Sequence, residues 1–291
     1  MKSQKIKLFC FGFGQVAENF VKTILSEGLN LEFNVTSRKE SHSLKLKKLN
    51  YNSYFLESYK FDKALLKKLE TADHVLISIP PVNNEDIVIK NFSAHLNKCK
   101  WVTYLSATSV YGNHNGKWVT EISKTKPSSS NGIARLNAEN LWKNLAKKND
   151  LPLQIFRLAG IYSNKFNILK RLQTNKLQIV DKKNHFFSRI HVEDVAKILF
   201  KSLDSFKRNE IYNISDDKPS SQREVAAYGA KLLKLEQPNS VKLEEVKSEM
   251  LQNFYKDSKK VDNKKMKDFF KYNLRFPTYE EGLNYIFNNN L

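Results

Sequence analysis

Residues 6–20 read IKLFCFGFGQVAENF, and this stretch decides the fold class of the chain. IKLF is a short apolar run typical of a buried strand, and glycines follow shortly after it. A second strand is predicted at residues 31–35, LEFNV. Between them, apolar residues recur at the spacing of one helix face until Gly28 ends the pattern, namely Val16, Phe20, Val21, Ile24 and Leu25. Strand, turn, helix and strand in this order predict a parallel β-α-β unit.

The alternation of strands and helices continues to about residue 160. Further strands are predicted at 75–80, 101–106 and 153–160, and further helices at 63–69 and 86–96. One more helix is indicated by residues that share a face, Ala134, Ala138, Leu141 and Leu145. Strands joined by helices lie parallel and need cover on both faces. We therefore predict an α/β fold with a doubly wound parallel sheet, the Rossmann architecture.

The glycine-rich turn has the pattern G-x-G-x-x-A, formed by Gly12, Gly14 and Ala17. The first glycine permits a tight turn, the second lets a pyrophosphate approach the backbone, and the small third residue lets helix pack on strand. The helix N-terminus would point its free N–H groups at the phosphates. The alternative is a turn that merely requires glycines. The predicted cofactor contacts of this turn are Gly12, Phe13, Gly14, Gln15, Val16 and Ala17.

The end of the second strand reads Thr36-Ser37-Arg38-Lys39, where an NAD-binding protein usually carries a carboxylate for the ribose hydroxyls. Two hydroxyls and two cations suit a 2′-phosphate, and a guanidinium can grip it with two hydrogen bonds. The sequence therefore predicts NADP(H), with NAD as the less favoured cofactor. A solvated loop in a Lys-rich chain is the alternative. The remaining predicted cofactor contacts are Thr36, Ser37, Arg38, Ser78, Pro80, Ser106 and Arg135.

After residue 160 the regular alternation of predicted strands and helices changes. Strands are predicted at 188–192 and 211–215, with a helix at 194–203 between them. Ser221 and Glu224 form an S-x-x-E capping box ahead of a helix at 225–235, and the charged tail from 240 is helical in character. We predict a dinucleotide-binding core at 1–160, to which 185–215 return, and a smaller C-terminal substrate lobe made of 161–184 and 216–291.

Several segments together resemble the extended, atypical short-chain dehydrogenases/reductases of the NAD-dependent epimerase/dehydratase type. They are GFGQVA (12–17), YLSATSVYGNHNGKWVTE (104–121), RLAGIYS (157–163), SRIHVEDVA (188–196) and YNISDD (212–217), which stand in the family's order. The resemblance implies a Rossmann sheet that binds NAD(P) and a substrate held between that sheet and the C-terminal lobe.

The sequence departs from the catalytic set that this resemblance implies. The family uses a Ser or Thr, a Tyr as proton carrier, and a Lys four residues after that Tyr. The matching positions here are Ala107, Asn131 and Arg135. The side chain of Ala107 cannot form a hydrogen bond, and the amide of Asn131 does not exchange a proton near neutral pH as a general acid would. A one-residue change of register would restore Ser106 or Thr108, and Arg135 could still reach ribose hydroxyls.

Other residues are candidates for the missing chemistry. Tyr111 follows a strand end, and His191 has the unperturbed pKa best suited to proton transfer. The alternative for each is a structural role in the core. Tyr162 and Arg189 are predicted substrate contacts. Related sugar-nucleotide enzymes often carry an Arg where this chain has Phe187, so Arg189 would hold a smaller anion, or a buried carboxylate such as Glu193 or Asp194.

The composition excludes several other classes. The 291 residues are 41% hydrophobic, which is enough for a core, and the net charge is +19. That charge alone would suggest nucleic acid, but 41 cations are Lys, only 8 are Arg, and no run of five like charges occurs. Cys10 and Cys99 predict reduced thiols in a cytoplasmic protein. The isolated His residues predict no metal site, and no run is apolar enough for a membrane helix.

Two functions remain open from the sequence. The first is an NADP-preferring, epimerase/dehydratase-like oxidoreductase that acts on a hydroxyl- or carbonyl-bearing small molecule, such as a sugar derivative. The second is a catalytically silent NADP(H)-binding sensor or scaffold protein. In either case we expect no nucleic acid or membrane partner, and a monomer or homodimer.

Overall fold

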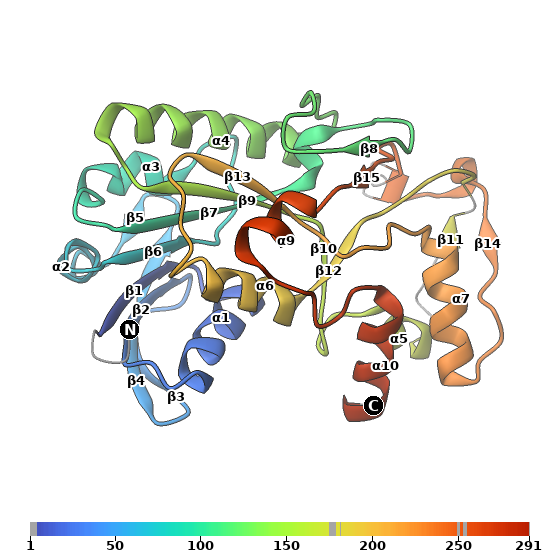
Figure 1. The fold of residues 1–291 in the computed structure, drawn as a ribbon, viewed down its shortest axis with the longest axis horizontal. Helices are drawn as coiled ribbons and strands as arrows, with labels where there is room; N and C mark the ends of the chain where they lie inside the picture. Colours follow the sequence, from blue (N-terminus) through green and yellow to red (C-terminus); the bar gives the residue numbers. More distant parts are fainter. Residues whose placement is uncertain (1–4, 175–178, 181, 249–250, 253–254, 291) are drawn as a thin grey trace. The chain divides into compact units, whose positions relative to one another are not determined.

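The structure, a computed structural model, describes residues 5–174, 179–180, 182–248, 251–252 and 255–290. The chain folds as two compact units (Figure 1). The first contains Met1–Ser106, Ile133–Arg157 and Val195–Tyr212, and the second contains Ala107–Gly132, Leu158–Asp194 and Asn213–Leu291. Each unit therefore combines three stretches that are far apart in the sequence. The sequence pattern did not indicate that residues 107–132 belong with the second unit.

A large sheet and its covering helices build the first unit. Its elements are β1 (Ile6–Phe11), α1 (Gln15–Ser26), β2 (Leu31–Ser37), β3 (His42–Leu46), β4 (Leu49–Glu57), β5 (Lys60–Phe61), α2 (Ala64–Glu70), β6 (His74–Ile77), α3 (Ile87–Phe92), the 3-10 turn η1 (Ser93–His95), β7 (Trp101–Ala107), α4 (Ser130–Asn149), β9 (Leu153–Leu158), α6 (Val192–Lys201) and β13 (Glu210–Ile214). The terminal residues of β7, α4, β9, α6 and β13 lie across the unit boundary.

The order of the strands places β1 at a reversal of the chain's path. Among the described residues the sheet has nine strands in the order β13-β9-β7-β6-β1-β2-β4-β3, with β5 paired to β4. β1 is parallel to both β2 and β6, and β2 is parallel to β4. The chain runs outward from β1 to one edge and then returns to β6 on the other side. Ligands of open α/β sheets bind at such a switch point, beside the carboxyl ends of the strands.

Helices cover the sheet on both faces. Leu65 and Leu69 of α2 join a single apolar cluster with Val88 of α3 and Trp142 of α4. On the other face Phe20 of α1 stacks on Trp101, with ring centroids 5.9 Å apart. Figure 1 shows α1 and α6 on one side of the strands and α3 and α4 on the other. The predicted α/β class with a doubly wound parallel sheet is confirmed.

The connection between β2 and β4 departs from a repeated strand–helix pattern. Instead of a crossover helix, β3 pairs antiparallel with β4 and forms the sheet edge. The sequence pattern did not predict this segment. The side chains of β3 are almost all exposed, so they carry little apolar signal.

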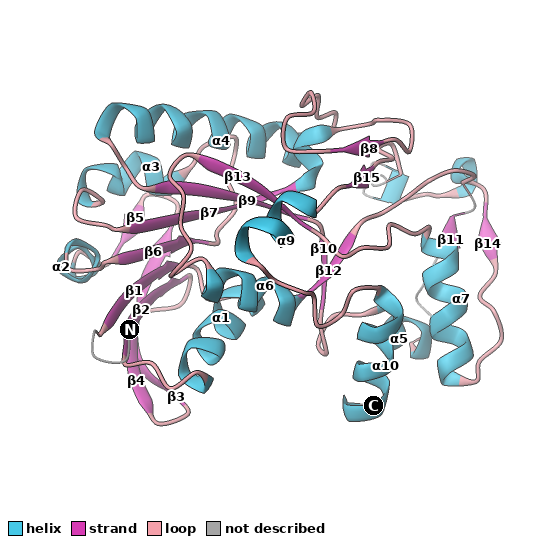
Figure 2. Cartoon of the chain, in the orientation of Figure 1, coloured by secondary structure: helices cyan, strands magenta, loops and turns pink. Residues whose placement is uncertain are grey.

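The second unit consists of short strand pairs and helices (Figure 2). Its elements are η2 (Thr108–Tyr111), β8 (Trp118–Val119), β10 (Gly160–Tyr162), α5 (Ile168–Gln173), β11 (Ile179–Val180), β12 (Arg189–His191), α7 (Gln222–Leu233), β14 (Ser240–Val241), η3 (Leu243–Glu245), β15 (Lys260–Val261), α9 (Lys264–Phe270) and α10 (Tyr279–Asn290). Its main apolar cluster joins residues of α5, α7 and α10. The capping box that the sequence predicts at Ser221 and Glu224 is present at the start of α7.

Candidate functional site

The turn after β1 has a backbone conformation that favours glycine. Gly12 has a φ of +86°, in the left-handed region. A Cβ at this position would lie 2.6 Å from Cγ2 of Ile79 and 3.0 Å from Oγ of Ser78. The tight turn predicted at Gly12 is therefore present, and any side chain there would displace the segment that follows β6.

Gly14 leaves open space in front of α1. It is the N-cap residue, with an extended backbone (φ −81°, ψ −173°) and no side-chain cap. Beyond its own turn and helix, no atom of the described residues lies within 4 Å of the place that a Cβ would take. A helix N-terminus with open space before it is suited to an anion. Phe13 packs its ring against Phe33 and Tyr51, so a cofactor contact from Phe13 would come from its backbone.

Three residues at the end of β2, Thr36, Ser37 and Arg38, differ in their side-chain contacts. The Thr36 hydroxyl is buried and accepts a hydrogen bond from the Gly12 amide at 2.9 Å. The Ser37 hydroxyl accepts a hydrogen bond from Ser53 of β4 at 3.0 Å. Arg38 is exposed, and its guanidinium has no hydrogen-bond or ion-pair partner among the described residues. Arg38 is therefore the group at this strand end that is most available to a ligand.

The segment after β6 contacts the glycine turn from the other side. Ser78 donates to the carbonyl of Phe11 at 3.0 Å and approaches that of Gly12 at 3.2 Å. Pro80 is exposed two residues further on. The predicted contacts at the ends of β1, β2 and β6 therefore meet at the switch point of the sheet.

A buried ion pair lies beneath the end of β7. Glu139 of α4 is fully buried and accepts two hydrogen bonds from Arg157, at 3.0 Å from Nε and 2.7 Å from Nη2. Ser106 donates its hydroxyl to the same carboxylate at 2.6 Å. One helical turn earlier, Arg135 donates to the carbonyl of Leu105 at 2.5 Å. The Ser106 hydroxyl is thus held by a structural network, and Arg135 is tied to the strand end.

The remaining candidates belong to the second unit. Tyr111 is fully buried and donates its hydroxyl to Oδ1 of Asn213 at 2.6 Å. Asn213 in turn donates its amide N–H to Glu121 and its side-chain N–H to the carbonyl of Asp262. Thr108 is half-buried, and its hydroxyl has no hydrogen-bond partner among the described residues. Of these two candidates only Thr108 keeps a free hydroxyl.

His191 lies in aromatic surroundings that keep it neutral. Its ring is fully buried and packs edge-on against Tyr162 and Phe276, with centroids 5.0 and 4.2 Å away. Burial, with a smaller contribution from Arg275, lowers the pKa of His191 to about 4. Nδ1 accepts the amide N–H of Glu193 at 3.3 Å, which assigns the ring proton to Nε2. His191 is therefore a neutral imidazole at pH 7.

The hydroxyl of Tyr162 has little access to water. Burial raises the pKa of Tyr162 well above its usual range, and the carboxylate of Asp216 raises it further. A phenol in these surroundings gives up its proton with difficulty. Tyr162 also packs closely on α10, because a Cβ at Gly282 would lie 2.0 Å from its hydroxyl.

Arg189 is held by neutral groups. Its guanidinium donates to the carbonyls of Phe187 and Ser220, both at 3.0 Å, and to Oε1 of Gln222 at 3.1 Å. The buried carboxylate whose charge acts on it is Asp216, and burial lowers the pKa of Arg189 while raising that of Asp216.

The two carboxylates that the sequence offered as partners of Arg189 are bound elsewhere. Glu193 pairs with Arg275, at 2.6 Å. Asp194 accepts hydrogen bonds from the Tyr272 hydroxyl and from the amides of Arg275 and Phe276. Both carboxylates therefore bind residues 272–276, which precede α10. The expectation that one of them pairs with Arg189 is wrong.

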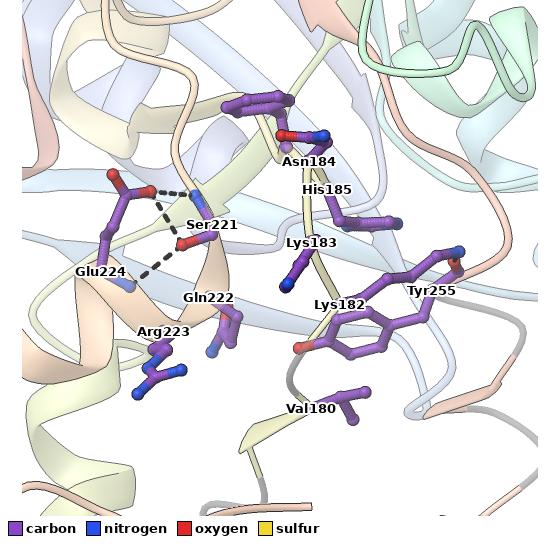
Figure 3. A pocket seen from close by; sticks show the side chains of 11 residues that line it. Val180, Lys182, Lys183, Asn184, His185, Ser221, Gln222, Arg223, Glu224 and Tyr255 are labelled. Carbon is purple, nitrogen blue, oxygen red and sulfur yellow. Dashed lines mark hydrogen bonds between the residues drawn. The ribbon is translucent and has the colours of Figure 1, made fainter. Parts of the chain in front are cut away.

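A basic pocket of about 200 Å³ opens at the start of α7 (Figure 3). In the figure the loop residues and Tyr255 lie on one side and the first turn of α7 on the other. Lys183 has no hydrogen-bond or ion-pair partner among the described residues, whereas Lys182 donates to the carbonyl of Tyr255 at 2.6 Å. The lining residues are Val180, Lys182, Lys183, Asn184, His185, Phe186, Ser221, Gln222, Arg223, Glu224 and Tyr255. Three of them are cationic and one is acidic, so the pocket suits an anionic group.

Comparison with known proteins supports the family resemblance. Residues 91–215 match the model of the NAD dependent epimerase/dehydratase family. A functionally unknown conserved protein from Silicibacter pomeroyi is 28% identical with a TM-score of 0.83, over 96% of this chain and 97% of that one. The resemblance to the epimerase/dehydratase family is confirmed. A comparison with curated proteins found no match.

Solved epimerases and dehydratases share the fold. UDP-glucuronic acid 4-epimerase from Bacillus cereus, in complex with NAD, is 17% identical with a TM-score of 0.76, over 97% of this chain and 98% of that one. The dTDP-glucose 4,6-dehydratase from Bacillus anthracis, also in complex with NAD, is 17% identical with a TM-score of 0.77, over 98% and 96% of the two chains. At this identity the likeness establishes the Rossmann fold.

The family match includes the positions where the sequence departs from the epimerase/dehydratase catalytic set. Ala107 ends β7, and Asn131 is an exposed residue near the start of α4. Arg135 follows one turn later, bound to a main-chain carbonyl. Neither Ala107 nor Asn131 offers a group that moves a proton.

Sequence reasoning missed several residues that organise these sites. Glu139 stands four residues after Arg135, so the spacing of one helix face could have pointed to it. Ser53 gave no signal, because its partner Ser37 comes from a strand 16 residues earlier. Lys182, Lys183 and Arg223 meet at one pocket from segments about 40 residues apart, and no local pattern connects them.

Neither metal nor membrane features occur in the described part of the chain. No group of three or more His, Cys, Asp or Glu side chains there is arranged to hold a metal ion. Within the same residues, no helix combines the length and apolarity needed to cross a membrane.

Proposed function

We propose that this protein is an NAD(P)-binding oxidoreductase of the epimerase/dehydratase type. The observation that carries the proposal is the open glycine turn at the switch point of the sheet. Gly14 provides a space that a Cβ would fill, directly before the N-terminus of α1, where a pyrophosphate would find backbone N–H groups and a favourable dipole. When bound, a nicotinamide cofactor supplies the hydride donor or acceptor. The substrate would be a small molecule with a hydroxyl- or carbonyl-bearing carbon.

The end of β2 favours NADP(H) over NAD(H). Arg38 is exposed and unpaired among the described residues, and Ser37 lies next to it. Residues 36–39 contain no carboxylate, which would repel a 2′-phosphate. A guanidinium–phosphate contact has the geometry and charge for this selection.

Calorimetric titration with NADPH and NADH tests the cofactor assignment. We expect both to bind and NADPH to bind more tightly. Equal affinities would refute the NADP preference, and no binding of either dinucleotide would refute the proposed function as a whole.

The basic pocket at α7 supports a substrate with an anionic group, such as a phosphorylated or carboxylated sugar derivative. Lys182, Lys183 and Arg223 supply the positive charge. We expect anionic sugar derivatives to protect the protein against thermal unfolding more than their neutral parents do. Lys183→Glu should remove this difference, because it replaces an unpaired cation with a repulsive charge. Equal protection by charged and neutral compounds would argue against the pocket.

The catalytic positions favour a second candidate, a catalytically silent NADP(H)-binding sensor. The hydroxyls of Ser106 and Tyr111 are both engaged, with Glu139 and Asn213. His191 is neutral and enclosed by aromatic rings. Thr108 is the one candidate hydroxyl without a partner in the described part of the chain.

Turnover assays decide between enzyme and sensor. If NADPH is oxidised, or NADP reduced, with any member of a broad panel of sugar and carbonyl compounds, the enzyme is supported. In that case Thr108→Val should reduce kcat, since it removes the free hydroxyl and keeps the shape. Tight cofactor binding without turnover across the panel would favour the sensor.

A further inference from the structure

Two hydroxyl groups hold the peptide of Gly12 from opposite sides. The Thr36 hydroxyl, at the end of β2, accepts the Gly12 amide proton at 2.9 Å. The Ser78 hydroxyl, just after β6, donates its one proton to the carbonyl of Phe11 at 3.0 Å and also lies 3.2 Å from that of Gly12. β2 and β6 are the two neighbours of β1 in the sheet. Both hydroxyls therefore come from the ends of the two strands that flank β1.

These contacts have a specific physical consequence for the turn. A glycine with positive φ has access to many other backbone conformations, so some other interaction must select the one observed. Thr36 is 1% exposed, so its hydroxyl is shielded from water and held in place as the acceptor of the Gly12 amide. Without that acceptor the Gly12 amide would lose its partner, and the turn would lose a constraint.

Thr36 and Ser37 are adjacent in the sequence, but their side chains have different partners. Side chains alternate between the two faces of a strand, so adjacent residues point in opposite directions. Thr36 contacts the glycine turn, whereas Ser37 accepts a hydrogen bond from Ser53 and lies beside the exposed Arg38. One strand end thus serves two tasks: it shapes the turn and it presents groups to a ligand.

We propose that Thr36 and Ser78 are positioning residues that preorganise the phosphate-binding turn and take no part in the choice between NADP(H) and NAD(H). The inference rests on the proposed function, because it assumes that the turn binds a dinucleotide. Both cofactors carry the same pyrophosphate and differ only in the 2′-phosphate. Loss of either hydroxyl therefore weakens both cofactors by the same factor, while Arg38 and Ser37 set their ratio.

The test uses Thr36→Val, which keeps the shape and removes the acceptor, and Thr36→Ser, which restores it. Thr23→Val is the matched control, because among the described residues the Thr23 hydroxyl bonds only to Asn19 of its own helix. The dissociation constants of NADPH and NADH are measured by calorimetry. Thr36→Val should weaken both by the same factor, about ten- to a hundredfold, with their ratio unchanged. Thr36→Ser should recover most of the affinity, and Thr23→Val should change neither.

Ser78→Ala provides an independent arm of the same experiment. It removes the hydroxyl donor to Phe11 and Gly12, whereas the backbone amide of residue 78 still donates to the Phe11 carbonyl at 2.9 Å. Ser78→Ala should again weaken both cofactors equally. Arg38→Ala is the contrasting variant, and it should weaken NADPH alone. A change of the NADPH-to-NADH ratio in Thr36→Val would show direct contact with the 2′-phosphate and overturn the proposal. Unchanged affinities in both Thr36→Val and Ser78→Ala would overturn it as well.

Hydrogen exchange of the Gly12 amide, read by NMR without cofactor, tests the contact itself. The amide should be protected in the parent and in Thr36→Ser, and should exchange at least about tenfold faster in Thr36→Val. If the parent binds neither dinucleotide, the proposed function fails and the positioning role for a cofactor fails with it, while this measurement still judges the contact. If Thr36→Val does not fold, an unprotected Gly12 amide in the parent would be enough to reject the inference.

Discussion

The glycine turn of the first unit and the candidate acids of the second unit make an instructive comparison. Around the turn, the residues singled out by the sequence are close together, and the two that matter most for a ligand, Gly14 and Arg38, are accessible. In the second unit, Tyr111 and His191 are fully buried. The hydroxyl of Tyr111 is used by Asn213, and His191 is kept neutral by its surroundings.

The difference follows from how each site is encoded. Gly12 to Ala17 are consecutive residues whose roles depend on one local turn, so the spacing predicts the geometry. A proton carrier depends on which groups surround it in three dimensions, because desolvation and partners set its pKa. Binding residues are therefore easier to infer from one sequence than catalytic residues are.

The largest expected effect is on stability, at the ion pair beneath β7. Glu139→Ala leaves the Arg157 guanidinium, 3% exposed, without its counter-charge, and should destabilise the protein by about 3–5 kcal/mol. Urea unfolding followed by circular dichroism measures this. Asp268→Ala, which removes an exposed partner of Lys264, should leave the midpoint unchanged. Coinciding midpoints of the two variants would show that the buried pair contributes no more than the exposed one.

The second prediction concerns acid stability and the second unit. The folded pKa of His191, about 4, lies below the ordinary value of 6.5, so the unfolded state binds a proton first as the pH falls. The stabilisation is complete above about pH 6.5 and is lost towards pH 4, with a maximum of about 3 kcal/mol. His191→Phe should flatten the pH dependence in this window, whereas His42→Gln, at an exposed position of β3, should not. Identical pH profiles for parent and His191→Phe would contradict the buried neutral state.

The third prediction tests the open space at Gly14. Gly14→Val should weaken NADPH and NADH by at least about a hundredfold, because the branched side chain occupies the room that the pyrophosphate needs. The fold should persist, since the added Cβ meets no neighbouring atom of the described residues. Gly28→Ala, just beyond the other end of α1, is the control: its φ of +73° makes it costly for stability but irrelevant to binding. Normal cofactor affinity in Gly14→Val would mean that the phosphate site lies elsewhere.

The fourth prediction tests the end of β2. Arg38→Asp should weaken NADPH by about ten- to a hundredfold and leave NADH unchanged, because a charge-assisted hydrogen bond is replaced by repulsion. Lys45→Asp, on the exposed strand β3, changes the net charge by the same amount and should affect neither cofactor. Similar losses in the two variants would indicate a general effect of net charge.

The smallest expected effect belongs to Asn131. If the protein turns over a substrate, Asn131→Ala should retain activity within about tenfold, because the side chain of Asn131 is exposed and is no general acid. Tyr111→Phe and His191→Ala provide the scale for comparison, since loss of a working proton carrier costs typically about 10²–10⁴-fold. A loss of that size in Asn131→Ala, with cofactor affinity unchanged, would reverse the conclusion about this position.

Local patterns predicted much of the fold. The strand–turn–helix at the N-terminus, the capping box at Ser221 and the strands at 75–80 and 101–106 appear close to their expected places. Each of these features depends on residues that are close together in the sequence. The β3–β4 hairpin escaped prediction, because the exposed residues of β3 leave no periodic apolar signal and its place is set by pairing with β4.

The Rossmann class, the glycine turn and the group of hydroxyls and cations at residues 36–39 could be inferred from the sequence, since they follow from spacing and chemical type along a continuous stretch. How those groups are used depends on the folded chain. It directs Thr36 to Gly12, leaves Arg38 exposed, engages Ser106 with Glu139 and encloses His191 among aromatic rings. Hydrogen-bond partners and burial depend on segments that meet in space, and a single sequence does not record which segments those are.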